Sequence, residues 1–277
     1  MYQSNRPSSF SNFPPVVKNL LIINGLCFLA YAVLESRGLF NMNKVFGLYY
    51  PESEYFKPFQ LITHVFMHGS FTHLFFNMFS LWMFGSVLEN YWGAKRFFIY
   101  YFVTAFGAAA LHLGINAIEV YQVKAAIAEF NLHADYDSFL NLIQRDSFLA
   151  NDSHVVDFLS GWQREPNNPA FLSGAKEITD FMLAHKMNIP VVGASGAVFG
   201  LLLGFGMLFP NTTLMMLFIP FPIKAKYFVI GYGALELYQG IAANPADNVA
   251  HFAHLGGMLF GFIMIKIWNK HNRQHFY

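Results

Sequence analysis

Three separate segments of the sequence carry polar residues that could take part in covalent catalysis. Ser195 lies in GASG, His254 lies in AHLGG, and His73 lies in HLFFN. A serine hydroxyl is a weak nucleophile until a neutral histidine within hydrogen-bond reach accepts its proton, and the same histidine can later protonate a leaving amine. These residues therefore predict acyl transfer with Ser195 as nucleophile and His254 as general base.

Negative charge that develops on an attacked carbonyl oxygen needs hydrogen-bond donors. We expect them to be the backbone N–H of Ser195 and the side chains of His73 and Asn77, with Gly193 completing an oxyanion or substrate-binding set. No carboxylate is evidently placed as the third member of a triad, so the sequence predicts a Ser–His dyad that requires no metal or other cofactor. Glu236 is the only acid well inside an apolar run, and we expect it to make a buried structural hydrogen bond instead of relaying protons.

The elements that must position these residues are membrane-spanning helices. The chain is 55% hydrophobic and only 12% charged, whereas about a quarter of the residues in soluble domains are charged. Several of its apolar runs approach the length of about 20 residues that a bilayer core requires. The chain has six apolar runs in all, at about 18–34, 74–88, 97–115, 191–209, 226–241 and 249–268. We therefore expect an all-α, polytopic membrane bundle of six transmembrane helices.

The apolar runs divide the chain into five predicted parts. The termini, 1–17 and 269–277, are short cytoplasmic tails, and residues 18–115 hold helices one to three with an outer loop at 35–72. Residues 116–190 form an extracytoplasmic insertion, in which apolar residues at helical spacing predict amphipathic helices lying on or over the outer membrane surface. Helices four to six occupy 191–268. Gating, docking and plain loop decoration all remain open as the role of the insertion.

Charge placement predicts the orientation. With six spans and a cytoplasmic N-terminus, every short loop that carries a basic pair falls on the inside, as the positive-inside rule requires. The inner basic residues are Arg6, Lys18, Lys95, Arg96, Lys224, Lys226, Lys266, Lys270 and Arg273. The single cysteine, Cys27, rules out an intrachain disulfide, and a net charge of +1 gives no indication of a nucleic-acid partner.

Helix geometry places the candidate residues in one layer. Predicted spans two, four and six run in the same direction, and His73, Ser195 and His254 each follow the start of a span by a turn or two. At 1.5 Å per residue they lie at a similar depth, about 5–10 Å below the outer surface. Small residues let membrane helices approach closely. Stripes of them on spans four and six, which we expect to bring these two helices together, consist of Gly196, Gly200, Gly204, Gly257 and Gly261.

Four motifs, in this order, resemble those of the rhomboid family of intramembrane serine proteases. They are HGSFTHLFFNMFSLWMFGSVLE, YWGAKRF, GASGAVFG and AHLGGMLFG, and the resemblance covers about 59–268 apart from the insertion. It implies Ser195 as nucleophile, His254 as base, and an active site that opens to the outer side. Phe199 stands where some members have a tyrosine stacked on the histidine. A core without a seventh helix is typical of members in bacterial inner membranes.

The predicted function is hydrolysis of peptide bonds in or near transmembrane segments, with transmembrane proteins as substrates and the lipid bilayer as surroundings. The alternative is a non-catalytic rhomboid-like protein that binds membrane clients, and a transporter or channel is a further rival. His64 and His68 have the spacing of a metal-ligand pair, but the chain lacks HExxH and a neighbouring carboxylate, which disfavours a metalloprotease. We expect His112 to be structural. The natural substrate and the oligomeric state stay open.

Overall fold

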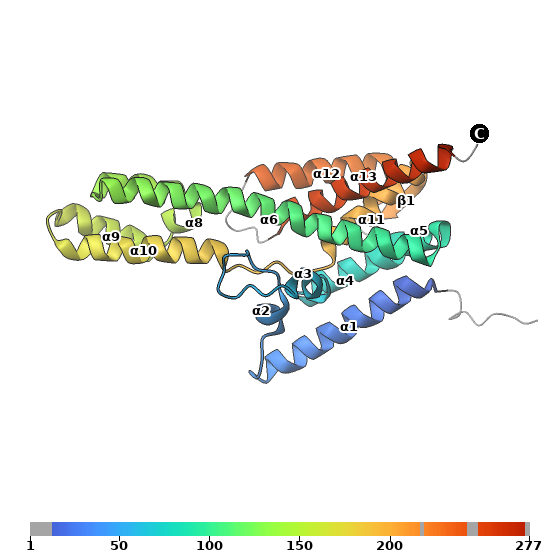
Figure 1. The fold of residues 1–277 in the computed structure, drawn as a ribbon, viewed down its shortest axis with the longest axis horizontal. Coiled ribbons are helices and arrows are strands. Elements are labelled where there is room, and N and C mark those ends of the chain that lie inside the picture. The colour runs from blue at the N-terminus through green and yellow to red at the C-terminus, as the bar shows by residue number, and fades with distance from the viewer. Residues whose placement is uncertain (1–12, 217–218, 243–248, 275–277) are drawn as a thin grey trace, which may run out of the picture.

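The computed structural model describes residues 13–216, 219–242 and 249–274, and it is a bundle of helices with one small β-hairpin (Figure 1). The bundle consists of α1 (Pro15–Ser36), α4 (Phe71–Ser80), η2 (Leu81–Gly85), α5 (Ser86–Trp92), α6 (Ala94–Leu132), α11 (Ser195–Leu208), α12 (Ala225–Ala242) and α13 (His251–Gln274). The loop after α1 contains α2 (Met42–Phe46), α3 (Gln60–Thr63) and η1 (His64–Phe66). The hairpin of β1 (Thr213–Met216) and β2 (Ile219–Lys224), which the sequence did not predict, joins α11 to α12.

The chain is an all-α polytopic membrane protein. Among the described residues, four helical segments are long and apolar enough to cross a membrane: Pro15–Ser36, Phe71–Trp92, Ala94–Leu132 and His251–Lys270. Ser195–Leu208 is a shorter apolar helix. Large side chains such as Ile22, Leu26 and Leu29 are more than half exposed on α1, which is the arrangement of a helix whose outer face contacts lipid. That the chain crosses the membrane six times stays a prediction.

The centre of the bundle is formed by α6, α11 and α13, which pack at backbone distance because glycines line their contacts. A Cβ atom at Gly257 on α13 would overlap the carbonyl oxygen of Gly196 on α11. A Cβ at Gly200 or Gly261 would instead collide with Thr104 or Tyr100 of α6, and the Tyr100 hydroxyl donates a hydrogen bond to the Gly200 carbonyl at 2.8 Å.

The glycine stripes therefore serve two contacts where the sequence analysis expected one. Gly196 and Gly257 join α11 to α13, as predicted. Gly200 and Gly261 also lie close together between these helices, since a Cβ at Gly261 would be 3.4 Å from the Gly200 carbonyl oxygen. In addition, the Cβ positions of Gly196, Gly200 and Gly204 face Ala108, Thr104 and Tyr100 of α6, a second contact that was not predicted. The reason is that α6 crosses both of the other helices, and its bulky side chains need the space that these glycines leave.

A buried carboxylate fixes the start of α1 to the end of the helical segment before α6. Both oxygens of Glu89, in α5, accept hydrogen bonds from the first backbone N–H groups of α1, from Val16 at 2.9 Å and from Val17 at 2.8 Å. The first N–H groups of a helix have no acceptor within the helix, and a negative charge there also complements the helix dipole. Glu89 thus anchors α1 to the bundle.

The insertion begins inside a helix that also belongs to the bundle. The predicted boundary at 115/116 falls in the middle of α6, which has 39 residues and at 1.5 Å per residue is about 58 Å long, far more than the roughly 30 Å of a hydrocarbon core. Its second half packs with four further helices, α7 (Tyr136–Gln144), α8 (Ser147–Ala150), α9 (Ser153–Arg164) and α10 (Pro169–Met187).

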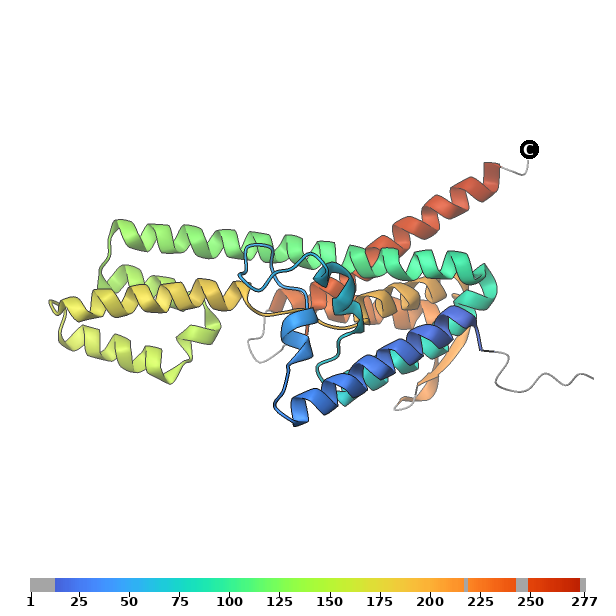
Figure 2. The same ribbon diagram turned by 60° about the horizontal axis from the view of Figure 1, so that its bottom comes forward.

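These helices do not lie flat across the end of the bundle. Figures 1 and 2 show α10 alongside the far half of α6, so that this part of the chain extends the long axis of the molecule. Their apolar faces pack against one another around Phe130, Phe139, Trp162 and Met182. The structure thus has helices with apolar faces where the periodicity predicted them, and these faces are covered by protein. Their position on or over the outer membrane surface stays a prediction.

Candidate active site

Ser195 is the first residue of α11, and the loop before it is held by hydrogen bonds to the loop that follows α1. Val191 and Leu48 exchange two backbone hydrogen bonds of 2.8 and 2.9 Å, and the N–H of Gly193 donates to the carbonyl of His64 at 2.9 Å. Gly193 has a φ of 120°, a conformation that favours glycine. The backbone turns there and brings Ser195 to the N-terminus of α11.

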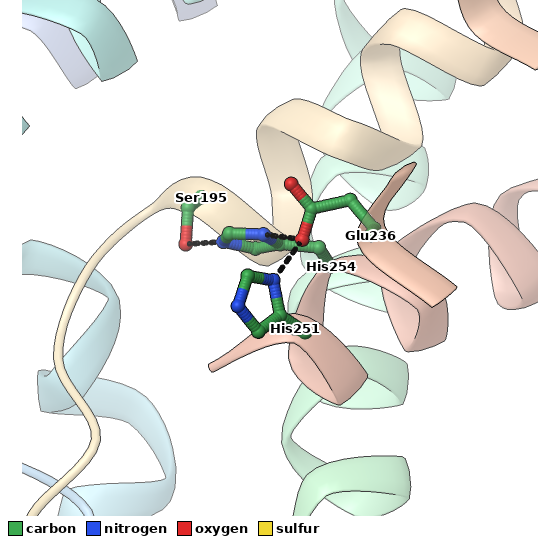
Figure 3. A network of polar contacts seen from close by, with 4 residues as sticks. All are labelled: Ser195, Glu236, His251 and His254. Carbon is green, nitrogen blue, oxygen red and sulfur yellow. Dashed lines mark hydrogen bonds and ion pairs between the residues drawn. The ribbon is translucent and has the colours of Figure 1, made fainter. Parts of the chain in front are cut away.

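The Oγ atom of Ser195 lies 2.9 Å from Nε2 of His254 (Figure 3). His254 is in the first turn of α13, and its ring stacks on Phe199, which is one turn beyond Ser195 on α11. The two ring centroids are 4.1 Å apart with an interplanar angle of 8°. The aromatic ring that the sequence placed beside the histidine is therefore present and stacked. Close packing of α11 against α13 at Gly257 makes this contact possible.

The sequence did not indicate a carboxylate beside the histidine, but the structure has one, in the buried hydrogen bonds expected of Glu236. Oε2 of Glu236, on α12, lies 2.8 Å from Nδ1 of His254 and 2.7 Å from Nδ1 of His251. Figure 3 shows both rings directed at this one carboxylate oxygen. Glu236 is only 3% exposed, so the contact is shielded from water.

A signal for this contact was present in the sequence. His251 and His254 are three residues apart in HFAH and so share one helix face. Two imidazoles side by side in an apolar helix need an acceptor for their N–H groups. Glu236 is the acid in the apolar run immediately before them, and it could have been assigned on that ground.

His73 and Asn77 lie beside the backbone of Gly193, two residues before Ser195. A Cβ atom built on Gly193 would be 2.8 Å from Nε2 of His73 and 3.7 Å from Nδ2 of Asn77. Nδ2 of Asn77 is buried and has no hydrogen-bond partner among the described residues. The N–H of Ser195, at the first position of α11, has no acceptor within its own helix. The predicted oxyanion donors thus gather at one place.

The remaining histidines of the loop do not form a metal site with these residues. Nδ1 of His64 lies 2.7 Å from the carbonyl oxygen of Gln60, and the ring of His68 is 5.2 Å from that of His73. Burial lowers the pKa of His68 to about 4, which keeps it neutral at physiological pH. In the part of the chain that the structure describes, the one cluster of three potential ligands consists of Glu236, His251 and His254, whose ligand atoms lie within 4.8 Å of one another.

His112, expected to be structural, lies on α6 with its Nε2 atom 3.3 Å from Nδ2 of Asn116. The structure therefore gives it a local hydrogen bond one turn along its own helix.

A small cavity adjoins Ser195 on the side of α6. Its volume is about 20 Å³, which is enough for one water molecule. Two residues with polar side chains, His64 and Ser195, line it together with Val65, Ala105, Ala108, Ala109, Val191, Val192, Gly193, Gly196, Ala197 and Ala253.

Comparison with protein families gives one match, to the model described as the Rhomboid domain, over residues 55–124 and 171–270. These two segments cover more than half of the chain, and they include every residue of the site described above. The unmatched residues between them fall in the helical insertion. The search of curated proteins found no match.

Proposed function

Because this chain belongs to the rhomboid family, whose members are generally intramembrane proteases, we propose that it is a serine endopeptidase that hydrolyses peptide bonds in or near transmembrane segments. The observation that carries the proposal is the 2.9 Å contact between Oγ of Ser195 and Nε2 of His254. A nucleophile and a base at this distance have the geometry that proton transfer requires.

The first half of the reaction acylates the enzyme. His254 accepts the proton of the Ser195 hydroxyl at Nε2 while Oγ attacks the carbonyl carbon of the scissile peptide bond. His254 then gives that proton to the leaving amine, and an acyl-enzyme ester on Ser195 remains. The ring of Phe199, parallel to that of His254, restricts the tilt of the imidazole during both transfers.

The oxyanion of the tetrahedral intermediate would be stabilised by the donors around Gly193. We assign this role to the N–H of Ser195 and to the side chains of Asn77 and His73. Nδ2 of Asn77 supports the assignment most directly, since it is a buried donor with no partner in the described part of the chain. Such a group costs free energy in the resting protein and gains its hydrogen bond only when an acceptor arrives.

The second half of the reaction needs a water molecule. His254 would accept a proton from water as its oxygen attacks the acyl carbon of the ester. The bond between that carbon and Oγ of Ser195 would then break, His254 would return the proton to Oγ, and the new carboxyl terminus would leave. The cavity of about 20 Å³ beside Ser195 is large enough to bind one water molecule near the ester.

We also propose the orientation that charge placement predicts, with both termini in the cytoplasm and the insertion and catalytic site towards the outer side, in a bacterial inner membrane. Substrates would then be transmembrane proteins cut near their outer ends. A helix must unwind locally before its carbonyl can be attacked, because its backbone groups are already hydrogen-bonded. Small or helix-breaking residues at the cut site are therefore expected.

The non-catalytic alternative is a protein that holds membrane clients without cutting them. Such a protein would not need a serine hydroxyl in contact with an imidazole, nor a ring stacked on that imidazole. Ser195, His254, Glu236 and His251 also form one connected cluster, whereas a transport pathway would need polar residues distributed across the bilayer. Both features favour the protease.

A fluorophosphonate probe tests the nucleophile without a known substrate, because it reacts with activated serines. The purified protein in detergent is expected to gain one label, which peptide mapping would locate at Ser195. Ser195→Ala and His254→Ala should abolish labelling, and Ser153→Ala, in the insertion, should leave it unchanged. Equal labelling of wild type and His254→Ala would contradict activation by the histidine.

A further inference from the structure

We propose that Glu236 is a positioning residue that makes the Ser195–His254 pair a triad, and that His251 in turn holds Glu236 in place. This inference rests on the proposed serine protease function and adds to it a third residue. The geometry behind it is the shared oxygen, Oε2 of Glu236, which lies 2.8 Å from Nδ1 of His254 and 2.7 Å from Nδ1 of His251.

Glu236 determines which ring nitrogen of His254 carries a hydrogen. An ionised carboxylate can only accept hydrogen bonds, so the Nδ1 atom of His254 must carry a hydrogen when it contacts Glu236. In the neutral ring this leaves Nε2 with a lone pair, and Nε2 is the atom 2.9 Å from Oγ of Ser195. Glu236 therefore selects the one neutral tautomer that can take the proton of the serine.

Glu236 also provides the negative charge that His254 needs during the reaction. When His254 accepts the proton of Ser195, the ring becomes an imidazolium, which is costly in a buried site without a counter-charge. The carboxylate of Glu236 lies directly behind it, and at 3% exposure it is poorly screened by water. An interaction that strengthens as positive charge develops lowers the barrier to the reaction.

His251 holds the carboxylate of Glu236 in position. It comes from the same turn of α13 as His254, and its Nδ1 atom contacts the same carboxylate oxygen. A carboxylate on a flexible side chain directs its oxygen reliably only when further hydrogen bonds hold it. His251 supplies such a bond from a helix that already carries the catalytic base, so movements of α12 relative to α13 are resisted at the triad itself.

The same three side chains could instead hold a metal ion, since two imidazoles and a carboxylate suit Zn²⁺. That use is incompatible with the proposed reaction. A metal on Nδ1 of His254 would leave the hydrogen of the neutral ring on Nε2, which would then be a donor towards Ser195 and could not accept its proton. The proposed reaction therefore requires the triad, since only the tautomer with a free Nε2 lone pair can accept the proton of Ser195.

The test compares Glu236→Gln and Glu236→Asp with wild type, using a model transmembrane substrate and steady-state kinetics. Glu89→Gln is the matched control, because Glu89 is also a buried carboxylate with two N–H donors but lies at the other end of the bundle. Glu236→Gln should lower kcat at least about tenfold with little change in KM. Glu236→Asp should recover part of kcat, and Glu89→Gln should lower thermal stability with kcat of the folded enzyme kept.

A second measurement does not depend on whether the Glu236 variants fold. Nitrogen-15 NMR of histidine-labelled wild-type protein reports which ring nitrogen of His254 is protonated, with His254→Ala providing the assignment. The Nδ1–H tautomer is expected. The Nε2–H tautomer, or activity that EDTA abolishes and Zn²⁺ restores, would overturn the triad.

The kinetics also separate the failure of this inference from failure of the proposed function. Cleavage by Glu236→Gln at the wild-type rate, with Ser195→Ala inactive, would leave a dyad protease and remove Glu236 from its mechanism. Cleavage that survives in Ser195→Ala would remove the serine protease itself.

Discussion

The ring of Phe199 lies parallel to the ring of His254, with 4.1 Å between the centroids and 8° between the planes. The two residues come from different helices, α11 and α13, and Phe199 is one turn from Ser195 on the same helix. The stack therefore ties the orientation of the proposed base to the helix that carries the proposed nucleophile.

Replacing this ring tests its contribution to catalysis. Aromatic pairs contribute about 0.5–1.5 kcal/mol beyond their buried area, so Phe199→Leu should lower kcat by roughly two- to tenfold. Phe199→Tyr keeps the stack and should stay close to wild type. Phe205→Leu is the control, since Phe205 is a buried aromatic of α11 that contacts Phe84 and not the histidine. Equal loss of kcat in Phe199→Leu and Phe205→Leu would argue for a general packing effect.

Gly257→Ala should separate α13 from α11. The added Cβ would overlap the carbonyl oxygen of Gly196, and overpacking of this kind typically costs about 1–3 kcal/mol. We expect a lower thermal midpoint together with loss of fluorophosphonate labelling at Ser195. The matched control is Gly114→Ala on α6, where nothing lies within 4 Å of the new methyl group. Wild-type labelling of Gly257→Ala would contradict the packing that we describe.

Asn77→Ala should damage catalysis without damaging the fold. Loss of one oxyanion donor typically lowers kcat about 100-fold or more. Since Nδ2 of Asn77 has no partner among the described residues, its removal breaks no hydrogen bond of the resting protein. Asn24→Ala is the control with the opposite expected result, a lower thermal midpoint and an unchanged kcat. Asn24 lies on α1, and its buried Nδ2 donates a hydrogen bond to the carbonyl of Leu20 at 2.8 Å. A fall in thermal midpoint with kcat unchanged for Asn77→Ala would exclude it as an oxyanion donor.

The pH dependence of stability should carry a contribution from His68. Burial lowers its pKa to about 4 in the folded protein, against about 6.5 in an unfolded chain. Between these values the unfolded state binds more protons, so stability is complete above about pH 6.5 and falls as the pH drops towards 4. The difference corresponds to at most about 3 kcal/mol.

The measurement is the thermal midpoint of wild type and His68→Leu in detergent at pH 7.5 and at pH 4.5. Other groups titrate in this range too, so the quantity of interest is the difference between the two proteins. His68→Leu should lose less stability on acidification than wild type. The same loss in both proteins would show that His68 does not titrate as its burial predicts.

Much of this site could be predicted from the sequence because its residues lie in helices whose periodicity and direction are readable. Ser195 and His254 were predicted to meet from their depth in parallel spans, and the structure has them in hydrogen-bond contact. The ring of Phe199 was anticipated only through the resemblance to the rhomboid family, some of whose members have a tyrosine stacked on the histidine at this place.

The sequence did not define how each helix is rotated about its own axis relative to its neighbours. Whether Glu236 faces the histidines depends on the rotation of α12 against α13. A single acid in an apolar run does not define that rotation, and only the pair of histidines in HFAH, which needs an acceptor, indicated it. The faces of Gly200 and Gly204 depend in the same way on where α6 crosses α11. For the insertion, apolar periodicity gave helices, but it could not distinguish a face that covers protein from a face that covers lipid.

The central claim, that Ser195 and His254 cut peptide bonds together, is tested most directly by cleavage of a model transmembrane substrate in proteoliposomes. Wild type is expected to produce two fragments whose new termini, located by mass spectrometry, fall in or near the transmembrane segment. Ser195→Ala and His254→Ala should each reduce the cleavage rate to background while keeping the thermal midpoint. Cleavage by either folded variant at a rate near that of wild type would contradict this account.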